Sequence, residues 1–488
     1  MLGAVSGSAG VSLGGGGLVV MEGTDARSGS TSVLADTTLE IGAAGSVAGA
    51  ISNQGTVIFN RSGDFTYNGA IGGTGMLVKE GAGRLTFPAV QPFTGDIVVN
   101  AGTLALTGGS PGSGQHRLNS GTLYINEGAT FSFNGTAQFG WAAGTPRVVM
   151  DGGRITTTNG TYQYLKDVTM RNGSRIEFGT TTSSGFTAVQ NYSMTSLVSE
   201  ASDTANVITG GAIAVANPMT VAVGRGAAVD DLVIESLLRN HPTTNADGSL
   251  VKNGPGILRL GAANSYSGDT RVLDGTLTLA HATLADAAGV HIADGATLHL
   301  PHGQADTVGG LWLGGVRMPA GTYHAGNTTA ITGGGSLVVA AGPPPGTYDA
   351  WITGHFPGET NPAVLGPHAD ANGDGVANAL VYLFGGDPKE GSNQTLLPTA
   401  MRVTDPGPPA PAGEYFVITY RHDSGASVVS FVESSDTLDG AWTPAVDGVD
   451  GVIVTTTPDG FAVGIDRVVV RIPGGVPRMF VRLGVIPQ

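Results

Sequence analysis

The feature that most constrains the fold is a glycine that returns every 19 or 20 residues, each time followed by a short run of alternating apolar and polar residues. The spacing is carried by Gly83, Gly102 and Gly121, by Gly153 and Gly173, and by Gly256, Gly275 and Gly295. Glycine adopts positive φ without steric cost, so a regularly spaced glycine is typical of a sharp corner. A fixed period of this length predicts one coil of a solenoid per repeat.

The runs that follow these glycines predict short strands with one buried face. In GTLAL, GTLTL and GATLHL the leucines alternate with other residues, which puts them on one side of a strand. Stacking equivalent strands from successive coils buries that side and leaves open edges only at the two ends. We therefore predict a right-handed parallel β-helix over residues 1–341. Its inward, stacked leucines are expected to be Leu104, Leu106, Leu258, Leu260, Leu277, Leu279, Leu298 and Leu300.

Two copies of a longer pattern lie 173 residues apart. LVKEGAGRLTF (Leu77–Phe87) matches LVKNGPGILRL (Leu250–Leu260), and FTGDIVVNAGTLAL (Phe93–Leu106) matches YSGDTRVLDGTLTL (Tyr266–Leu279). This pattern resembles the autotransporter-associated β-strand repeat found in passenger regions of large bacterial surface proteins. Residues Gly309–Val339 are similar to the closing segment of that family. The resemblance implies an exported β-solenoid that is surface-exposed or released, and it does not specify a ligand.

Composition and charge narrow the range of functions. A net charge of −15 and a pI near 4.9, without a cluster of Lys and Arg, argue against a nucleic-acid partner. The chain has no cysteine, which excludes disulfides and thiolate metal sites. No run of apolar residues is long enough for a transmembrane helix. The first residues lack a basic segment followed by an apolar one, so we expect an upstream segment to be missing from this sequence.

Proline-rich stretches divide the rest of the chain. Residues 342–347 and 405–413 are expected to be linkers, because consecutive prolines cannot continue the interior of a sheet. Residues 348–404 lie between them and contain a candidate calcium loop. In residues 414–488, strand-like runs separated by turn signals predict a small antiparallel β-sandwich-like module. This module resembles one found at the C-terminus of exported bacterial repeat proteins, and the whole chain is predicted to be all-β.

The segment HADANGDGVANALVYLFGGDP (His368–Pro388) has the spacing of an EF-hand-type or dockerin-type calcium loop. Side-chain oxygens fall at alternate positions, a glycine permits the tight turn, and one backbone carbonyl completes the set. Val381 stands where such loops carry a bidentate acid, which weakens binding unless Asp387 supplies another oxygen. We predict a structural Ca²⁺, and the alternative is a solvated Asx-rich turn before a short helix. The predicted ligands are Asp370, Asn372, Asp374, Val376 and Asn378.

Two further groups of residues have a chemical interpretation beside a structural one. Asp230, Asp231 and Glu235 are comparable to the paired carboxylates of polysaccharide lyases and hydrolases, yet DLVIESLL is more typical of a strand pair with polar residues facing out. Four histidines could stack as a metal site, but their apolar neighbours point inward, which favours surface imidazoles. These histidines are His281, His291, His299 and His302.

The long regular surface and the absence of a convincing catalytic constellation favour a protein that is not an enzyme. We expect a non-catalytic extracellular or cell-surface scaffold or adhesin-type passenger protein. The alternative is a solenoid that binds or degrades a polysaccharide. The expected partner is an unknown surface ligand, either a glycan or a protein.

Overall fold

The computed structural model describes residues 3–107, 121–135, 138–139, 145–158, 163–165, 167–179, 191–241, 247–344, 346–475 and 478–487. The chain forms two compact units. The first contains Met1–Val308 and Ala330–Leu337, and the second contains Gly309–Thr329 and Val338–Gln488. Among the described residues, no helix combines the length and the apolar character needed to cross a membrane.

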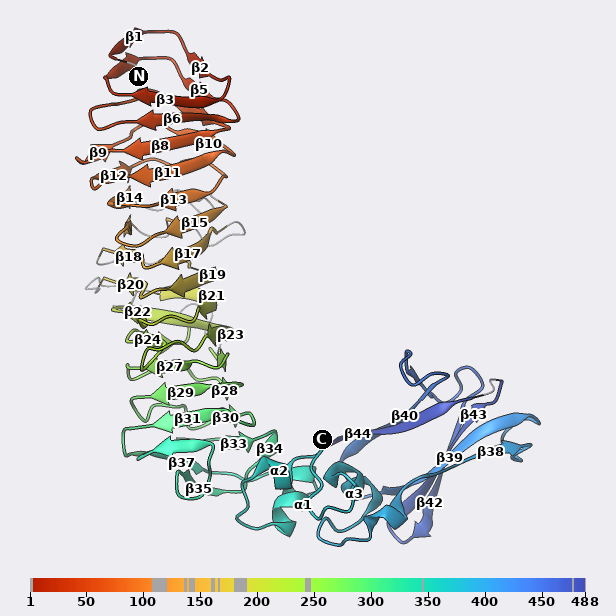
Figure 1. Cartoon of the computed structure of the whole chain (residues 1–488). Coiled ribbons are helices and arrows are strands. Elements are labelled where there is room, and N and C mark those ends of the chain that lie inside the picture. The colour runs from red at the N-terminus through yellow and green to blue at the C-terminus, as the bar shows by residue number, and fades with distance from the viewer. Residues whose placement is uncertain are drawn as a thin grey trace. The chain divides into compact units, whose positions relative to one another are not determined.

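The first unit is a parallel β-helix of about 13 turns, which confirms the predicted fold class (Figure 1). One face is a long sheet in which neighbouring strands come from successive coils and pair in parallel. In sheet order, its strands in this unit are β3 (Gly17–Met21), β6 (Thr37–Ile41), β8 (Thr56–Asn60), β11 (Met76–Glu80), β13 (Ile97–Val99), β15 (Thr122–Ile125), β17 (Arg147–Asp151), β19 (Asp167–Arg171), β21 (Asn191–Ser199), β23 (Ala212–Val223), β26 (Leu250–Asn253), β28 (Thr270–Val272) and β30 (Gly289–Ile292).

A second face is a twelve-stranded parallel sheet built from the strands that follow the corner glycines. Its order is β36 (Ile331–Gly333), β31 (Thr297–Leu300), β29 (Thr276–Leu279), β27 (Ile257–Leu260), β24 (Leu232–Ile234), β22 (Asn206–Thr209), β20 (Arg175–Glu177), β18 (Arg154–Thr157), β16 (Thr130–Asn134), β14 (Thr103–Thr107), β12 (Arg84–Phe87) and β9 (Phe65–Thr66). The unit's other strands are β1 (Val5–Gly7), β2 (Val11–Leu13), β4 (Asp25–Arg27), β5 (Thr31–Val33), β7 (Ile51–Asn53), β10 (Ile71–Gly73), β25 (Leu237–Arg239) and β32 (Ala305–Val308).

The core of the solenoid lies between these faces. All eight leucines predicted to point inward are buried, with at most 4% of their surface exposed. They are stacked in register, since Leu277 pairs with Leu258 of the preceding coil and with Leu298 of the next. The alternation in the sequence therefore identified the buried face correctly, because in a strand it converts directly into two opposite sides.

The corners between the two faces have no room for side chains. Gly102 and Gly275 have φ of 63° and 65°, in the left-handed region. A Cβ atom on Gly275 would lie 2.5 Å from the carbonyl oxygen of Gly256 and 2.6 Å from that of Gly254. Successive corners thus touch through their backbones, which explains physically why the repeat is marked by glycine.

The second unit begins with an antiparallel pair, β33 (Gly310–Leu313) and β34 (Val316–Arg317). Its first helix, α1 (Tyr348–His355), is capped by Thr347, and Asp349 in its first turn accepts a hydrogen bond from the backbone N–H of Arg317 at 2.9 Å. The helix is thereby fastened to the β33–β34 pair. The other elements of this unit are β35 (Gly321–His324), α2 (Pro362–Leu365), α3 (Asn378–Phe384) and the 3₁₀ turn η1 (Asn393–Leu396), and β37 (Ser336–Val339) contains residues of both units.

The C-terminal part of this unit consists of two antiparallel sheets that share one apolar core. The four-stranded sheet has the order β38 (Thr399–Thr404), β39 (Glu414–Asp423), β43 (Ile465–Pro473), β42 (Ile453–Ala462). The three-stranded sheet has the order β41 (Thr443–Pro444), β40 (Val428–Ser435), β44 (Phe480–Pro487). Residues 405–413 connect β38 to β39, which pair antiparallel. The shared core contains Leu383, Phe384, Ile418, Tyr420, Val432, Val452, Val468, Val470 and Ile472.

Tyr382 of α3 joins three segments of the second unit. Its hydroxyl donates a hydrogen bond to the carbonyl of Gly346, at 2.5 Å, and accepts one from the backbone N–H of Ser427, at 2.9 Å. Because α3 also contributes Leu383 and Phe384 to the core of the sheets, the helices and the sheets form one packed body. The Asp370–Asn378 loop, which leads into α3, therefore precedes a fixed element.

Candidate functional site

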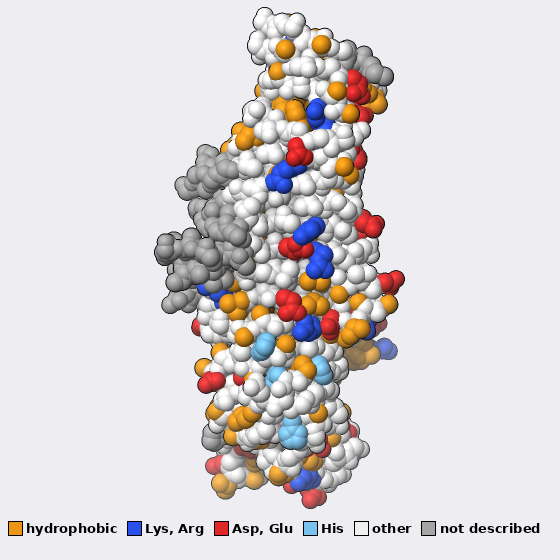
Figure 2. Space-filling view, turned by 90° about the vertical axis from the view of Figure 1, so that its left-hand side faces the viewer, with side chains coloured by type: hydrophobic (Ala, Val, Ile, Leu, Met, Phe, Trp, Pro, Cys, Tyr) orange, Lys and Arg blue, Asp and Glu red, His pale blue; other side chains and the backbone are white. Residues whose placement is uncertain are grey.

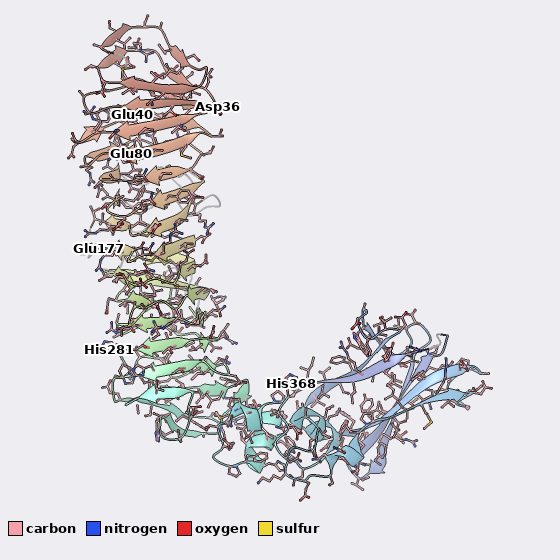
Figure 3. All side chains as sticks on the ribbon, in the orientation of Figure 1. Asp36, Glu40, Glu80, Glu177, His281 and His368 are labelled. Atoms are coloured by element: carbon pink, nitrogen blue, oxygen red, sulfur yellow. The ribbon has the colours of Figure 1, made fainter. Side chains whose placement is uncertain are left out.

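The loop predicted to bind calcium lies between α2 and α3 and begins at Asp370, two residues after His368 (Figure 3). Asp370 Oδ1 accepts hydrogen bonds from the backbone N–H groups of Gly373 (2.9 Å) and Asp374 (3.1 Å), and its Oδ2 accepts one from Gly375 (2.7 Å). Gly373 and Gly375 have φ of 73° and 85°, which only glycine adopts readily. The D-x-N-x-D-G spacing thus builds its own tight turn.

Asp374 is the centre of this turn. Its Oδ1 accepts a hydrogen bond from the N–H of Val376 (2.9 Å), and its Oδ2 accepts one each from the backbone N–H and the side-chain amide of Asn393 (3.1 and 3.0 Å). The Asp374 N–H in turn donates to Asn372 Oδ1 at 3.0 Å. Burial raises the pKa of Asp374, but the hydrogen bonds from Val376, Asn393 and Asn372 outweigh burial, so that the pKa lies below its ordinary value.

Asn393 is a residue of this site that sequence reasoning missed. It is buried, and its side-chain amide also donates to the carbonyls of Asp387 (2.9 Å) and Glu390 (2.7 Å). The Asn372 side-chain amide reaches the same Glu390 carbonyl at 2.6 Å. Asn393 therefore ties the segment after α3 back onto the loop. No local pattern marks it, because it lies 19 residues beyond Asp374 and meets it only through the fold.

The second half of the predicted calcium loop turns into the protein. Asn378 is the first residue of α3, and its side-chain amide donates to the carbonyls of Val364 (2.8 Å) and Gly366 (3.0 Å). The side chains of Val376 and Val381 are buried in the apolar core. Valine has no side-chain oxygen, so Val381 supplies no ligand at the position where calcium loops close their ligand set.

The carboxylate of Asp387, the alternative ligand for that closing position, has its contacts elsewhere. Its Oδ1 accepts a hydrogen bond from the N–H of Lys389 (2.9 Å) and lies 3.9 Å from Nε2 of His355. Within the described part of the chain, no group of three or more His, Asp or Glu side chains is arranged to hold a metal ion. The loop offers two carboxylates, those of Asp370 and Asp374, together with amide and backbone oxygens, which are ligands that suit weak Ca²⁺ coordination.

Two of the three acidic residues compared with a catalytic group, Asp231 and Glu235, are paired with arginines. Asp231 is buried, and its carboxylate accepts hydrogen bonds from Arg225 Nη1 (3.1 and 3.0 Å) and from the N–H groups of Gly226 and Ile257 (2.7 Å each). Glu235 is exposed and forms an ion pair with Arg259. Both carboxylate oxygens of Asp231 thus accept hydrogen bonds, and Asp230 is half-buried beside it.

Of the four histidines, His281 is exposed and the other three are partly buried. His291 Nε2 is 3.3 Å from Asp269 Oδ2, and His299 Nδ1 is 2.9 Å from Thr332 Oγ1. His302 Nδ1 accepts a hydrogen bond from the N–H of Gln304, and His281 is exposed. Figure 2 shows the imidazoles of this face gathered in its lower part. The interpretation of these histidines as surface imidazoles stays a prediction.

A polar furrow crosses four consecutive coils near the start of the solenoid and encloses about 490 Å³. Its floor contains Gly55 and Gly75, and a Cβ atom on Gly75 would lie 2.2 Å from the carbonyl oxygen of Gly55, so no side chain fits there. Asp36, the residue before β6, also lines the furrow (Figure 3). The remaining polar side chains of the furrow are Thr37, Thr38, Gln54, Thr56, Thr74 and Asp96.

Two buried lysines were also missed by sequence reasoning. Lys79 and Lys252 occupy the same position in the two copies of the longer pattern, and they are 1% and 0% exposed. A signal was present, because the pattern L-x-K places each lysine two residues after a buried leucine and therefore on the same side of the strand. Both side chains consequently lie inside the solenoid.

A stack of glycine-cornered coils around a continuous apolar core defines a β-solenoid repeat protein. Residues 77–106 and 250–279 match the model of the passenger-associated-transport-repeat family. These are the two segments whose pattern resembles the autotransporter-associated β-strand repeat, so the match supports a passenger-type repeat in both of them. No curated protein and no solved structure matches the chain.

Proposed function

We propose that this chain is a non-catalytic scaffold or adhesin-type passenger protein that acts outside the cell or on its surface. The observation that carries the proposal is a solenoid of about 13 turns that contains two passenger-associated-transport repeats. A long, regular surface presents many equivalent positions to a partner, which suits adhesion better than chemistry at one point. The partner is a glycan or a protein exposed on a surface.

The contacts of Asp231 and Glu235 support this proposal over an enzyme. Hydrolysis or elimination at a sugar requires two converging carboxylates with free oxygens. In the strongest candidate group, the Asp231 carboxylate accepts hydrogen bonds from Arg225 and from backbone N–H groups, and Glu235 forms an ion pair with Arg259. We therefore expect binding without turnover.

A glycan array and a reducing-sugar release assay, run on the same preparation of the full chain, test the proposal. Binding to cells, surface proteins or glycans without release of reducing ends is the expected result. Reproducible turnover of any polysaccharide would show that the protein is an enzyme. An Asp231→Asn variant then separates the cases, because loss of turnover in a folded variant would assign catalysis to that carboxylate.

A second candidate, polysaccharide binding without catalysis, is favoured by the furrow. It presents hydroxyl, amide and carboxylate groups on successive coils, which stack about 4.8 Å apart as neighbouring strands do. Gln54 and Thr74 are joined across two coils by a hydrogen bond of 2.9 Å between Oε1 and Oγ1. A linear polyhydroxylated chain lying along the solenoid axis could meet one such group per coil.

The furrow is tested with the variant that combines Gln54→Ala and Thr74→Ala. We expect this change to weaken binding of a captured polysaccharide about tenfold, since it removes two side-chain hydrogen-bonding groups. Glu40→Ala is the matched control, because Glu40 lies near the other end of β6 from Asp36 (Figure 3). Equal affinity of both variants and the parent chain would place the binding site elsewhere.

We further propose that the Asp370–Asn378 loop binds one structural Ca²⁺. Asp370, Asn372 and Asp374 supply side-chain oxygens, and Val376 supplies its backbone carbonyl. Asn378 is the weakest of the predicted ligands, because its Oδ1 already accepts a hydrogen bond from the N–H of Ala371 and its amide donates to the carbonyls of Val364 and Gly366. With only two carboxylates the affinity belongs in the extracellular range, with Kd of about 10⁻⁴ to 10⁻³ M.

Differential scanning calorimetry of the full chain, with calcium and with a chelator, tests this site. At about 5 mM calcium, a site in this affinity range stabilises the folded state by about 1–2 kcal/mol. The double change Asp370→Ala with Asp374→Ala should abolish the calcium-dependent shift in Tm, whereas Asp387→Ala should preserve it. An unchanged Tm in the parent chain, or an equal shift in the double variant, would leave the Asx-rich turn as the explanation of the motif.

A further inference from the structure

Each of the two family-matched segments holds a lysine ammonium group inside the solenoid. The residues paired with Lys79 on the neighbouring strands are Phe59 and Val99, and those paired with Lys252 are Val221 and Val272. The lysines therefore stand in rows of otherwise apolar side chains. A charge at such a position is costly unless all of its hydrogen-bond donors are satisfied.

The ammonium groups are satisfied entirely by backbone carbonyls. Lys79 Nζ donates to Glu80 (2.6 Å), Gly81 (2.7 Å) and Ala101 (3.1 Å). Lys252 Nζ donates to Asn253 (3.1 Å), Gly254 (2.6 Å) and Asp274 (2.8 Å). An ammonium group has three N–H donors, so each lysine is saturated. In both copies two acceptors belong to the corner of the lysine's own coil, and the third belongs to the corner of the next coil.

The corners that supply these carbonyls have the same geometry in the two copies. Gly81 and Gly254 have φ of 70° and 77°, and the glycines of the following corners, Gly102 and Gly275, have φ of 63° and 65°. These corners touch through their backbones. The lysine thus lies beside a direct contact between two coils and binds both partners of that contact.

Apolar stacking alone leaves the pairing of such coils ambiguous. A shift by one residue would expose the buried side chains, but a shift by two keeps every leucine inward. A buried ammonium that requires three carbonyls at fixed places is compatible with only one of these registers. Buried polar groups are known to select a register in this way, at a cost in stability.

We propose that Lys79 and Lys252 are register locks, each of which fixes the pairing between two consecutive coils by binding the carbonyls of both corners. The family-matched segments 77–106 and 250–279 are then the places where the solenoid is aligned. Traced back coil by coil, the row of Lys252 runs through Val221 and Leu197 to Leu77, two residues before Lys79, so each lock fixes only the pairing beside it.

The protonation of the lysines agrees with this role. Burial lowers the pKa of both to about 8, against the opposing effect of Glu80 on Lys79 and of Asp274 and Asp231 on Lys252. Both are therefore cationic at neutral pH. Because burial disfavours the charge, the contribution of the lysine is to the choice of register and not to a gain in net stability.

Disulfide cross-linking measures the register directly, since the chain has no cysteine of its own. Val251 pairs with Arg271 in the observed register, so Val251→Cys with Arg271→Cys should cross-link. The pair Val251→Cys with Leu273→Cys reports a shift by two residues. In the native register its two Cα atoms lie beyond the disulfide limit of about 7 Å, so this pair cross-links only after the shift. We expect Lys252→Met to raise cross-linking of the shifted pair about tenfold.

Lys389→Met is the matched control, because Lys389 is exposed and lies over the ring of Phe356. It should leave both cross-links unchanged. The proposal would be overturned if the shifted pair cross-linked to the same extent in the parent chain, in Lys252→Met and in Lys389→Met. If Lys252→Met prevents folding, NMR of the lysine Cε carbons in the parent chain tests the proposal through the protonation state of Lys79 and Lys252. Two neutral buried amines at about pH 6 would also overturn the proposal.

Discussion

At the scale of single residues, the inward leucines carry the stability of the solenoid. Leu277 is fully buried between Leu258 and Leu298, so Leu277→Ala should lower the local free energy of unfolding by about 2–5 kcal/mol. Leu273→Ala, in the same coil but 47% exposed, should cost far less. Hydrogen exchange of residues 250–300 distinguishes the two variants, and equal losses of protection would contradict the assigned core.

Asp374 gives the second unit an acid-sensitive residue. Because hydrogen bonds hold its pKa below the ordinary value of 3.8 in the folded state, its stabilising contribution is complete above that value and is lost as the pH falls through the lower, folded pKa. We expect Asp374→Asn to cost about 1–3 kcal/mol near neutral pH and to flatten the acid limb of the stability curve. Urea unfolding between pH 2 and about 6 measures both effects. If the acid limb of Asp374→Asn kept the slope of the parent chain, the loss of stability in acid would belong to other carboxylates.

At the scale of the element, a coil corner depends on what surrounds its glycine. Gly275→Ala would force a Cβ atom to within 2.6 Å of two carbonyl oxygens, whereas Gly295 has a similar φ, 78°, and open space around it. Both changes carry the left-handed cost of about 1–2 kcal/mol, and only Gly275→Ala adds about 1–3 kcal/mol of overpacking. Thermal unfolding of the two variants compares them. Equal destabilisation would mean that the corners do not touch.

At the scale of the whole molecule, unfolding should be graded. Each coil of the solenoid contacts mainly its neighbours, and the second unit has its own core. Urea transitions followed by hydrogen exchange in segments 77–106, 250–279 and 414–473 should therefore have different midpoints. One common midpoint for all three segments would show that the chain unfolds as a single cooperative unit.

What the sequence by itself determined is the coil. The glycine period, the inward leucines and the tight turn at Asp370 follow from contacts within a few residues, where φ preference and alternation decide the structure. The tertiary structure alone decided which groups meet across coils and elements. Lys79 and Lys252 donate hydrogen bonds to carbonyls of the next corner. Asp231 accepts hydrogen bonds from Arg225 and Ile257, and Asp374 accepts one from Asn393. The partners in most of these contacts lie about 20 or more residues apart, and only stacking or packing brings them within hydrogen-bond reach.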